Sequence, residues 1–506
     1  MSDLTLRQLR NTNFSTLYKK LLTSSSLNNI EKEKILEIAI LFLNSSNKTL
    51  QELGYRMVLR YSNKFKNYVP LYDVAINKGY IPITKFIENE ILIDEFPKEN
   101  FFNNYIASFE EIFRKEDIYL TKEQYELNTY FEENNKENLA IVAPTSYGKS
   151  ELILSTIFNN STSNICILVP TKSLLAQTRQ RIINDKKYNF KRKIITHPEM
   201  YFKSDKNFVA VLTQERLLRL LQKNNNLSFD IVIVEEAHNL LENDLRSRLL
   251  ATSLIILNYR NNELIYKFLT PFLLNFDNLF VEYTDYQMKK FRVEEEIKSK
   301  YFYIYNFNKK KELRLYDHFL NKFFNISDYN YDSDLDFIIE NASDKNIVYL
   351  NKPQDIENLS KRFLYYHDMK QNDKLLKACQ DIGEYIHEDY LLIDCLKKGI
   401  AYHHGSVPNN IRLFVEHIFS KINEVSYMIT TSTLLEGVNI PGEKLFILDC
   451  NKGRSYLTHS QFKNLIGRVC RFNEIFNSKK KELDMLEPDI YLVGSRYMTK
   501  NQRFLK

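Results

Sequence analysis

The stretch Ala143-Pro144-Thr145-Ser146-Tyr147-Gly148-Lys149-Ser150 constrains the fold of this chain more than any other. The apolar run 139–142 before it is typical of a buried parallel strand, and residues 151–157 after it are typical of the start of a helix. A strand, a tight loop and a helix in this order direct backbone N–H groups and the helix dipole at one point. The sequence therefore predicts a phosphate-binding loop.

The residue types in this loop suit the triphosphate of ATP. Lys149 is long enough to reach the β- and γ-phosphates, and the Ser150 hydroxyl is a ligand for Mg²⁺. Gly148 lets the backbone approach the phosphates because it has no Cβ, and Thr145 and Ser146 lie in the same cradle. A chance Gly-Lys-Ser is the alternative, and the flanking strand and helix argue against it.

Length and composition indicate the number of domains and the kind of protein that carries this site. A chain of 506 residues should hold about three domains. No apolar run approaches the roughly 20 residues that span a bilayer, and residues 1–7 do not resemble a secretory signal, so we expect a cytoplasmic protein without membrane contact. The five cysteines form no Cys-x-x-Cys pair, which favours buried free thiols over a metal site.

The formal net charge of +6 permits nucleic-acid binding without requiring it. Four basic clusters are either solvated loops or contacts to nucleic acid, and the sequence leaves both open. They are Lys186-Lys187, Lys191-Arg192-Lys193, Lys309-Lys310-Lys311 and Lys479-Lys480-Lys481.

Residues 1–112 have apolar side chains at helical spacing and no catalytic pattern. We expect an all-α accessory domain that either binds a partner or braces the rest of the chain. From residue 113 short apolar strands alternate with helices, which predicts a parallel α/β sheet. Gln124, just before the loop, carries an amide that could pair with an adenine edge, and a surface glutamine is the alternative.

Polar side chains follow the later strands of this sheet. Thr171 and Lys172 follow the strand 165–169 and suit a phosphate of a nucleic-acid strand, because strand ends form the functional edge of a parallel sheet. Strand 229–234 ends at Glu235-Glu236-Ala237-His238. Buried paired carboxylates need a cation or partner, so we expect Glu235 to hold Mg²⁺ and Glu236 to orient and deprotonate the attacking water, with His238 linking the ATP site to the second domain. An acidic helix N-terminus is the alternative.

These segments, in this order, resemble motifs I, Ia, Ib and II of the superfamily 2 helicases. Motif Ib corresponds to Thr213-Gln214-Glu215-Arg216-Leu217, which implies phosphate contacts from Thr213 and Arg216. The family pattern has Asp where this chain has Glu235. The counterpart of the Ser-Ala-Thr motif III is Leu269-Thr270-Pro271-Phe272, a clear departure.

A second α/β domain is expected from about residue 345. Strand 346–350 resembles motif IV, and segment 430–441 closely resembles motif V of the branch that contains exosome-associated RNA helicases and archaeal repair DNA helicases. The resemblance implies that Thr431 contacts a nucleic-acid phosphate and that Gly437 lies near the nucleotide. His403-His404-Gly405 fits the same branch, and without a third ligand at metal-site spacing we expect hydrogen bonding at a strand end.

Residues 464–471 resemble motif VI, with Asn464 in place of Gln. Arg468 and Arg471 are spaced one helical turn apart, and a planar guanidinium suits a phosphoryl group that develops charge. Between motifs V and VI, residues 451–454 predict a turn, where a short hairpin could separate strands as it does in relatives. Relatives usually continue past motif VI with further domains, so the chain is either compact or a fragment.

We therefore expect an all-α domain (1–112), a RecA-like domain (113–300), a connecting region (301–335) and a second RecA-like domain (336–506). The leading hypothesis is an ATP- and Mg²⁺-dependent helicase or translocase acting on DNA or RNA with a single-stranded segment. The alternative is a nucleotide-gated clamp or regulatory subunit without unwinding. A composition rich in Asn, Lys and Ile without Trp suggests a bacterium, and compact helicases of this kind resemble phage-defence components paired with a partner such as a nuclease.

Overall fold

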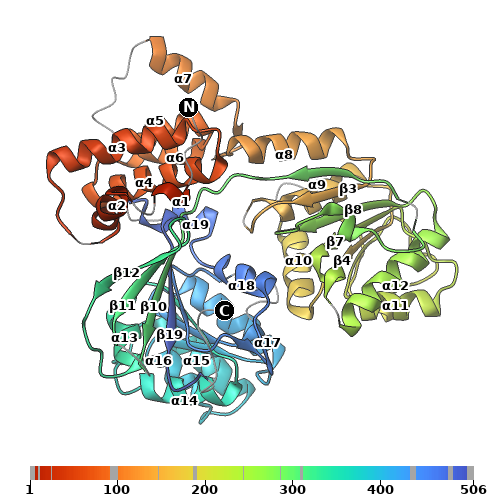
Figure 1. Ribbon diagram of the computed structural model, residues 1–506. Coiled ribbons are helices and arrows are strands. Elements are labelled where there is room, and N and C mark those ends of the chain that lie inside the picture. The colour runs from red at the N-terminus through yellow and green to blue at the C-terminus, as the bar shows by residue number, and fades with distance from the viewer. Residues whose placement is uncertain are drawn as a thin grey trace. The chain divides into compact units, whose positions relative to one another are not determined.

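The chain forms two compact units in the computed structural model (Figure 1). The first contains residues 1–122, 296–434 and 439–506, and the second contains residues 123–295 and 435–438. The residues described below are 6–9, 12–23, 25–91, 101–145, 147–185, 191–242, 244–284, 286–307, 311–433, 440–476 and 482–498.

The N-terminal part of the first unit is helical, as the apolar spacing predicts. Its elements are α1 (Leu6–Leu9), α2 (Phe14–Leu22), α3 (Asn29–Leu43), α4 (Lys48–Phe65), α5 (Val69–Lys78), α6 (Ile81–Phe86), a π-helical turn (Ile87–Ile91) and α7 (Phe101–Glu111). Asn28 begins α3 with a capping box completed by Glu31, and Asn47 caps α4. A small hairpin of β1 (Arg114–Lys115) and β2 (Ile118–Tyr119) follows.

The second unit is a seven-stranded parallel sheet in the order β5-β6-β4-β7-β8-β3-β9. The strands are β3 (Leu139–Val142), β4 (Ile165–Leu168), β5 (Ile194–Ile195), β6 (Val209–Leu212), β7 (Ile231–Glu235), β8 (Ile265–Thr270) and β9 (Lys289–Arg292). The helices are α8 (Lys122–Glu133), α9 (Lys149–Asn159), α10 (Lys172–Asn184), α11 (Gln214–Lys223) and α12 (Leu245–Arg260), with 3₁₀ turns at Pro198–Met200, Ala237–Leu241 and Phe276–Leu279.

Strands β3, β4 and β6 of this sheet are buried at every position. Such strands read as continuous apolar runs because both faces of a parallel sheet are covered. The predicted α/β architecture is confirmed here, and the carboxyl ends of β3, β8, β7, β4 and β6 follow one another along one edge.

The first unit also holds an eight-stranded sheet in the order β12-β11-β10-β19-β16-β13-β15-β14. Its strands are β10 (Tyr301–Asn306), β11 (Leu313–Asp317), β12 (Lys322–Ser327), β13 (Asn346–Tyr349), β14 (Ile400–His403), β15 (Tyr427–Thr430), β16 (Lys444–Ile447) and β19 (Asp489–Gly494). Its helices are α13 (Asp334–Glu340), α14 (Pro353–Phe363), α15 (Asp373–Tyr385), α16 (Leu391–Lys397), α17 (Asn409–Lys421), α18 (His459–Ile466) and α19 (Phe472–Phe476), with a 3₁₀ turn at Asp484–Leu486.

Residues 301–327 differ from the connecting region that the sequence suggested. Strand β10 pairs in parallel with β19 over six residues, and β11 and β12 extend the sheet in antiparallel fashion. The run of tyrosines in β10 has high strand propensity, and Tyr303 stacks on Tyr491 of β19 with ring centroids 5.0 Å apart. These strands therefore belong to the second sheet.

A separate two-stranded hairpin, β17 (Asn451–Lys452) and β18 (Ser455–Tyr456), turns at Gly453, where φ is +63°. The predicted turn at 451–454 is thus confirmed. Within the described parts of the chain, no helix is both long and apolar enough to cross a bilayer.

Candidate ATP site and nucleic-acid edge

The phosphate-binding loop joins β3 to α9, as predicted. Gly148 precedes the first residue of α9 with φ +87°, a conformation that L-residues rarely adopt. A Cβ built on Gly148 would meet no described atom within 4 Å. The positive φ is therefore a reason for glycine at this position in its own right, beside the close approach to phosphates that the sequence predicts.

Lys149 is the first residue of α9, and its ammonium turns back over the loop. It donates hydrogen bonds to the carbonyl of Ala143 (2.6 Å) and to that of Pro144 (3.0 Å). The backbone N–H of Ala143 in turn donates to the carbonyl of Thr270, at the end of neighbouring β8 (3.0 Å). The loop is thus fixed to the sheet at its start and carries the lysine at its end.

The two adjacent carboxylates lie where β7 ends. Glu235 is the last residue of β7, and Glu236 follows with φ +55°, which turns the chain sharply into the 3₁₀ turn. Oε2 of Glu235 is buried, and no hydrogen-bond donor meets it within the described residues. A buried carboxylate oxygen without a donor is costly unless a cation satisfies it, so this site fits the Mg²⁺ ligand that the sequence predicts.

The surroundings of Glu235 raise its pKa to about 7, chiefly because it is buried and also because Glu236 is adjacent. Lys149, Arg181 and a hydrogen bond from the Thr178 side chain oppose this effect. Thr178 and Arg181 lie one turn apart on α10 and belong to none of the motifs recognised in the sequence, so they were not predicted. Their only signal is the Thr178 hydroxyl among the buried residues of this helix.

His238 is buried beside these carboxylates. Its Nδ1 lies 3.1 Å from the Thr270 hydroxyl and 3.4 Å from Oε2 of Glu236, and its ring lies 4.4 Å from that of Phe272. The Thr270 hydroxyl donates its proton to the carbonyl of Phe272, so it accepts from His238 and the imidazole is protonated at Nδ1. Burial lowers the pKa of His238, which favours the neutral ring. The divergent motif III segment therefore contacts motif II directly.

Four of the five residues predicted to contact nucleic acid follow β4 and β6, which are neighbours in the sheet. Thr171 is buried and caps α10 by accepting from the N–H of Leu174, while Lys172 beside it is exposed. Thr213 is buried immediately before α11. Arg216 donates to the carbonyl of Thr196 at 2.7 Å. The structure brings these side chains to one stretch of the sheet edge, and phosphate contact remains a prediction.

The other predicted nucleotide contacts are more scattered. Thr145 lies in the loop and Ser150 in the first turn of α9, both half-buried, and Gln124 is buried on α8. Ser146 and Gly437 lie outside the described residues. Of the basic clusters, Arg192 is structural, because its guanidinium donates to the carbonyls of Asn207, Ile157 and Asn160.

The two predicted arginines lie in the first unit, beyond the end of a helix. Helix α18 ends at Ile466, and residues 467–471 form an irregular loop in which Cys470 has φ +49°. The expectation that Arg468 and Arg471 are one helical turn apart is therefore wrong: α18 ends before both of them, and the left-handed Cys470 lies between them. We call residues 467–471 the arginine loop.

Both arginines of this loop are largely withdrawn from solvent. Arg468 is 4% exposed and donates from Nη2 to Oδ1 of Asn464 at 2.9 Å. Burial and, to a lesser degree, adjacent Arg468 lower the pKa of Arg471 to about 9, while Glu474 opposes both effects. Arg471 stays charged near neutral pH, as a phosphoryl-binding guanidinium must.

His403, the last residue of β14, is hydrogen-bonded at the strand end as the sequence suggested, whereas neither ring nitrogen of His404 has a hydrogen-bond partner among the described residues. Nδ1 of His403 lies 3.0 Å from the hydroxyl of Thr433, and that hydroxyl lies 3.4 Å from the hydroxyl of Thr431. His403 thus supports the predicted phosphate-contacting threonine. Among the described residues, no three His, Cys, Asp or Glu side chains are grouped so that they could hold a metal ion.

Comparison with known proteins agrees with this geometry. Residues 121–265 match the family model of the DEAD/DEAH box helicases. The matched segment begins just before Gln124 and ends at the start of β8, and it includes the phosphate-binding loop and both carboxylates.

Curated relatives extend the similarity to the second α/β domain. The chain is 21% identical over 383 residues to the ATP-dependent DNA helicase Hel308 of Thermoplasma volcanium, which covers 72% of this chain and 53% of the relative. It is 22% identical over 352 residues to Anti-bacteriophage protein B of Escherichia coli, covering 66% of this chain and 44% of the relative. Human Helicase POLQ-like is 30% identical over 117 residues, or 22% of this chain and 10% of that protein.

The chain thus spans about half the length of the first two relatives. The similarity agrees with the order of the motifs along the chain and with the parallel sheets that carry them. Over residues 121–265 the chain is thus similar to the DEAD/DEAH box helicases, and over a longer stretch it is similar to an ATP-dependent DNA helicase.

Proposed function

We propose that this chain is an ATP-dependent nucleic-acid helicase or translocase. The observation that carries the proposal is the ATP site of the second unit. There Lys149 at the start of α9 and the carboxylates of Glu235 and Glu236 at the end of β7 flank the carboxyl end of β8.

Each residue has a role in this proposal. The loop and Lys149 bind the phosphates of ATP, Ser150 and Glu235 hold Mg²⁺, and Glu236 orients and deprotonates the attacking water. Bound Mg²⁺ would neutralise charge on the phosphates. The orphaned Oε2 of Glu235 supports the metal assignment.

Arg468 and Arg471, supplied by the second α/β domain, would stabilise the phosphoryl group during transfer. A guanidinium supplied in this way is worth on the order of 10³–10⁵ in rate. Arg468 is buried and donates a hydrogen bond to Oδ1 of Asn464, which supports the proposal that its guanidinium is already oriented before ATP binds.

We assign the nucleic-acid contacts to Thr171, Lys172, Thr213, Arg216 and Thr431. Contacts to phosphates carry little base specificity, so binding should depend on salt more than on sequence. DNA is the first substrate to test because the relative from Thermoplasma volcanium is named a DNA helicase. The name of the Escherichia coli relative supports a role in anti-phage defence, which we place in the cytoplasm, where ATP is available.

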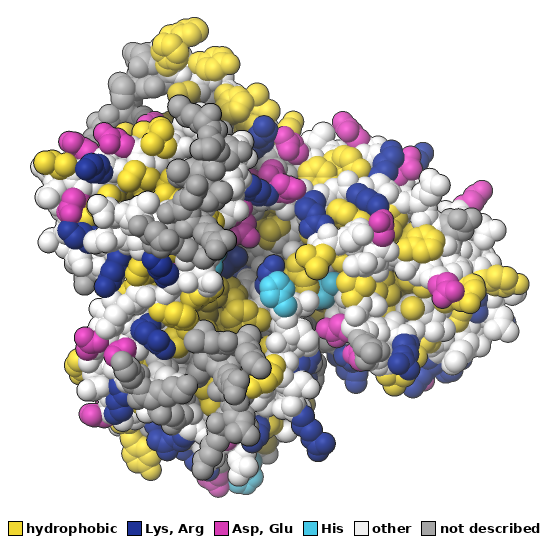
Figure 2. Space-filling view, viewed as in Figure 1, with side chains coloured by type: hydrophobic (Ala, Val, Ile, Leu, Met, Phe, Trp, Pro, Cys, Tyr) yellow, Lys and Arg dark blue, Asp and Glu magenta, His cyan; other side chains and the backbone are white. Residues whose placement is uncertain are grey.

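The apolar face of α7 is the surface that we assign to a protein partner such as a nuclease. Phe101, Phe102 and Tyr105 are exposed on this helix, and apolar side chains gather on it at the top of the view in Figure 2. Exposed aromatic side chains of this kind are typical of interaction surfaces.

The test is ATP hydrolysis measured with single- and double-stranded DNA and RNA, beside strand displacement on a tailed duplex. The proposal expects hydrolysis that single strands stimulate and that Lys149→Ala abolishes. Hydrolysis indifferent to every nucleic acid would defeat the motor assignment. Stimulated hydrolysis without displacement or movement would favour the nucleotide-gated clamp.

A further inference from the structure

The helical domain holds the segment that leads into the second sheet. Two residues of α4 reach the backbone of this segment: the Tyr55 hydroxyl donates to the carbonyl of Ile297 (2.8 Å) and Nη1 of Arg56 donates to that of Lys300 (2.9 Å). Both bonds join residues more than 240 positions apart in sequence. We call residues 297–300 the braced segment.

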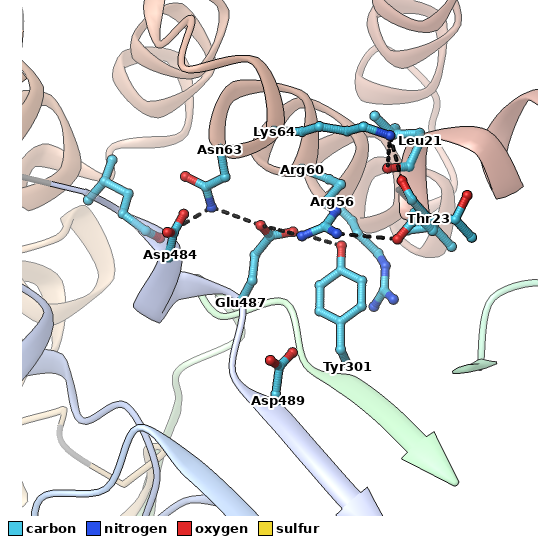
Figure 3. Close-up of polar contacts among 12 residues, drawn as sticks. Leu21, Thr23, Arg56, Arg60, Asn63, Lys64, Tyr301, Asp484, Glu487 and Asp489 are labelled. Carbon is cyan, nitrogen blue, oxygen red and sulfur yellow. Dashed lines mark hydrogen bonds and ion pairs between the residues drawn. The ribbon is translucent and has the colours of Figure 1, made fainter. Parts of the chain in front are cut away.

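Arg56 is the centre of this contact and is 1% exposed. Its guanidinium lies over the ring of Tyr301, 4.0 Å from the centroid, and 3.7 Å from Oδ2 of Asp317. Figure 3 shows how α4 continues the contact: Asn63 donates to Glu487 (2.8 Å), and Glu487 accepts from the Tyr301 hydroxyl (2.7 Å). The attachment is therefore a buried, charge-assisted network rather than a surface contact.

The braced segment in turn holds the arginine loop. Nζ of Lys298 donates to the carbonyl of Val469, which follows Arg468 directly (3.2 Å). The adjacent N–H of Ser299 is bonded to the carbonyl of Leu486, so the segment is fixed from several sides. A chain of direct contacts thus runs from α4 through the braced segment to the arginine loop.

The arginine loop depends on such outside supports. Helix α18 ends at Ile466, so the arginine loop lies outside that helix. The left-handed conformation of Cys470 is held by a hydrogen bond from its N–H to the carbonyl of Gly442 (2.6 Å). A second contact from the helical domain reaches α19, the helix that follows the loop: Phe86 of α6 packs against Phe476 with ring centroids 6.0 Å apart. A cavity of about 550 Å³ lined by Asn63 and Lys64 of α4 also has Cys470 in its wall.

From these contacts we infer that the helical domain is an internal brace of the arginine loop, with Tyr55, Arg56 and Lys298 as positioning residues for Arg468 and Arg471. The inference rests on the proposed function for its catalytic consequence. It assigns the bracing role to α4, whose side chains are bonded to the braced segment and to Glu487, and it leaves the exposed face of α7 for the partner.

The test uses substitutions that remove one hydrogen bond each and keep the bulk of the side chain. In Lys298→Met and in Tyr55→Phe we expect the turnover number for ATP to fall roughly three- to tenfold, with KM for ATP changed less than about twofold. Turnover should fall more than KM changes because the arginines are proposed to stabilise the transition state rather than the bound ATP. Lys300→Met and Tyr72→Phe are the matched controls, since the Lys300 ammonium takes no part in the brace and the Tyr72 hydroxyl bonds Glu88 instead.

Two further measurements keep the inference separate from the proposed function. In an Arg468→Ala, Arg471→Ala background, Lys298→Met should cause no additional loss of turnover. Without any nucleotide, hydrogen exchange of the amides in 467–476 should become several-fold faster in Lys298→Met than in Lys300→Met. Any one of three results would overturn the inference that the helical domain braces the loop. They are unchanged amide exchange in Lys298→Met, an equal loss of ATP turnover in the control variants, and a further loss of turnover when Lys298→Met is added to the double arginine variant. Absent ATPase activity in the unmodified chain would instead overturn the proposed function and leave the exchange result to decide the brace.

Discussion

Asn464 accepts a hydrogen bond from Nη2 of Arg468 at 2.9 Å, and both side chains are buried. The amide sits in the last turn of α18, and the guanidinium lies just beyond the end of that helix. Asn464 takes the place of the glutamine in the helicase motif and keeps a carbonyl oxygen directed at the arginine. The shorter side chain still orients one of the two guanidinium groups assigned to the phosphoryl group.

Replacing Asn464 with leucine should lower ATP turnover by tenfold or more. A hydrogen bond to a charged group is worth about 1.5–3 kcal/mol, and Asn464→Leu removes the acceptor at similar volume. Asn464→Gln restores the family residue and should retain most of the activity. Steady-state turnover at saturating ATP checks both variants, and equal activity in Leu and Gln variants would contradict the role.

Glu236→Gln should separate binding from hydrolysis. A lost general base costs about 10²–10⁴ in rate, while the amide keeps the size of the side chain and its contact with His238. We therefore expect retained binding of ATP and nucleic acid with a collapse of turnover, measured by fluorescent-nucleotide titration and by phosphate release. Turnover within a factor of two of the unmodified chain would exclude Glu236 as the base.

Lys172→Ala should weaken nucleic-acid binding uniformly across sequences. Removing one phosphate contact should reduce the slope of log K against log salt by about 1. The control is Lys223→Ala. Lys223 is also an exposed lysine, but it lies in the last turn of α11, whereas Lys172 lies in the first turn of α10. Titrations of labelled single strands at several salt concentrations provide the measurement, and identical slopes in the two variants would remove Lys172 from the interface.

The Thr270 hydroxyl should couple hydrolysis to movement along the strand. Thr270→Ser keeps the contacts to His238 and to the Phe272 carbonyl, whereas Thr270→Val removes both. We expect the Val variant to lose strand displacement or translocation several-fold more than hydrolysis and the Ser variant to keep both. Parallel losses of the two activities in Thr270→Val would show that the hydroxyl serves the ATP site alone.

Acid should destabilise the first unit through His403. Burial lowers the pKa of this fully buried imidazole to about 3, with Arg412 and His404 acting in the same direction. Between that value and the unfolded pKa of about 6.5 the unfolded chain binds the extra proton, so stability is present above pH 6.5 and is lost as the pH falls below it.

The loss should approach about 1.4 kcal/mol per pH unit from this one group. His403→Gln removes the titration, so the difference in unfolding free energy between pH 7.5 and pH 5.5 should shrink by roughly that amount. Urea unfolding at the two pH values measures it. An equal acid sensitivity in the variant would show that His403 is not held neutral.

The sequence was sufficient to predict those parts of the candidate site that are formed by contiguous residues. The strand, loop and helix around Lys149 and the carboxylates at the end of β7 are short local patterns, and parallel topology alone brings them to one edge. The His403 hydrogen bond was predictable for the same reason. His403 ends β14, and β14 pairs in parallel with β15, so the residues that follow β15 lie beside it.

Contacts between distant segments were not predictable in this way. The bond from Tyr55 to Ile297 joins positions 242 residues apart, and neither residue belongs to a motif. The arginine loop shows a second limit, because the spacing of Arg468 and Arg471 also fits a helix. The left-handed Cys470 that excludes the helix depends on a bond to Gly442, which no local pattern reveals.

The β17–β18 hairpin has one more property of practical interest. Asn351, just after β13, exchanges two hydrogen bonds of 2.8 Å with the backbone of Gly453 at the hairpin's turn, and the Tyr349 hydroxyl donates to the carbonyl of Asn451. The projection is therefore anchored through its main chain, and the side chains of Lys452 and Arg454 are left out of the anchor. Substitutions at those two positions should therefore leave the position of the turn unchanged, which makes them suitable for attaching a reporter group.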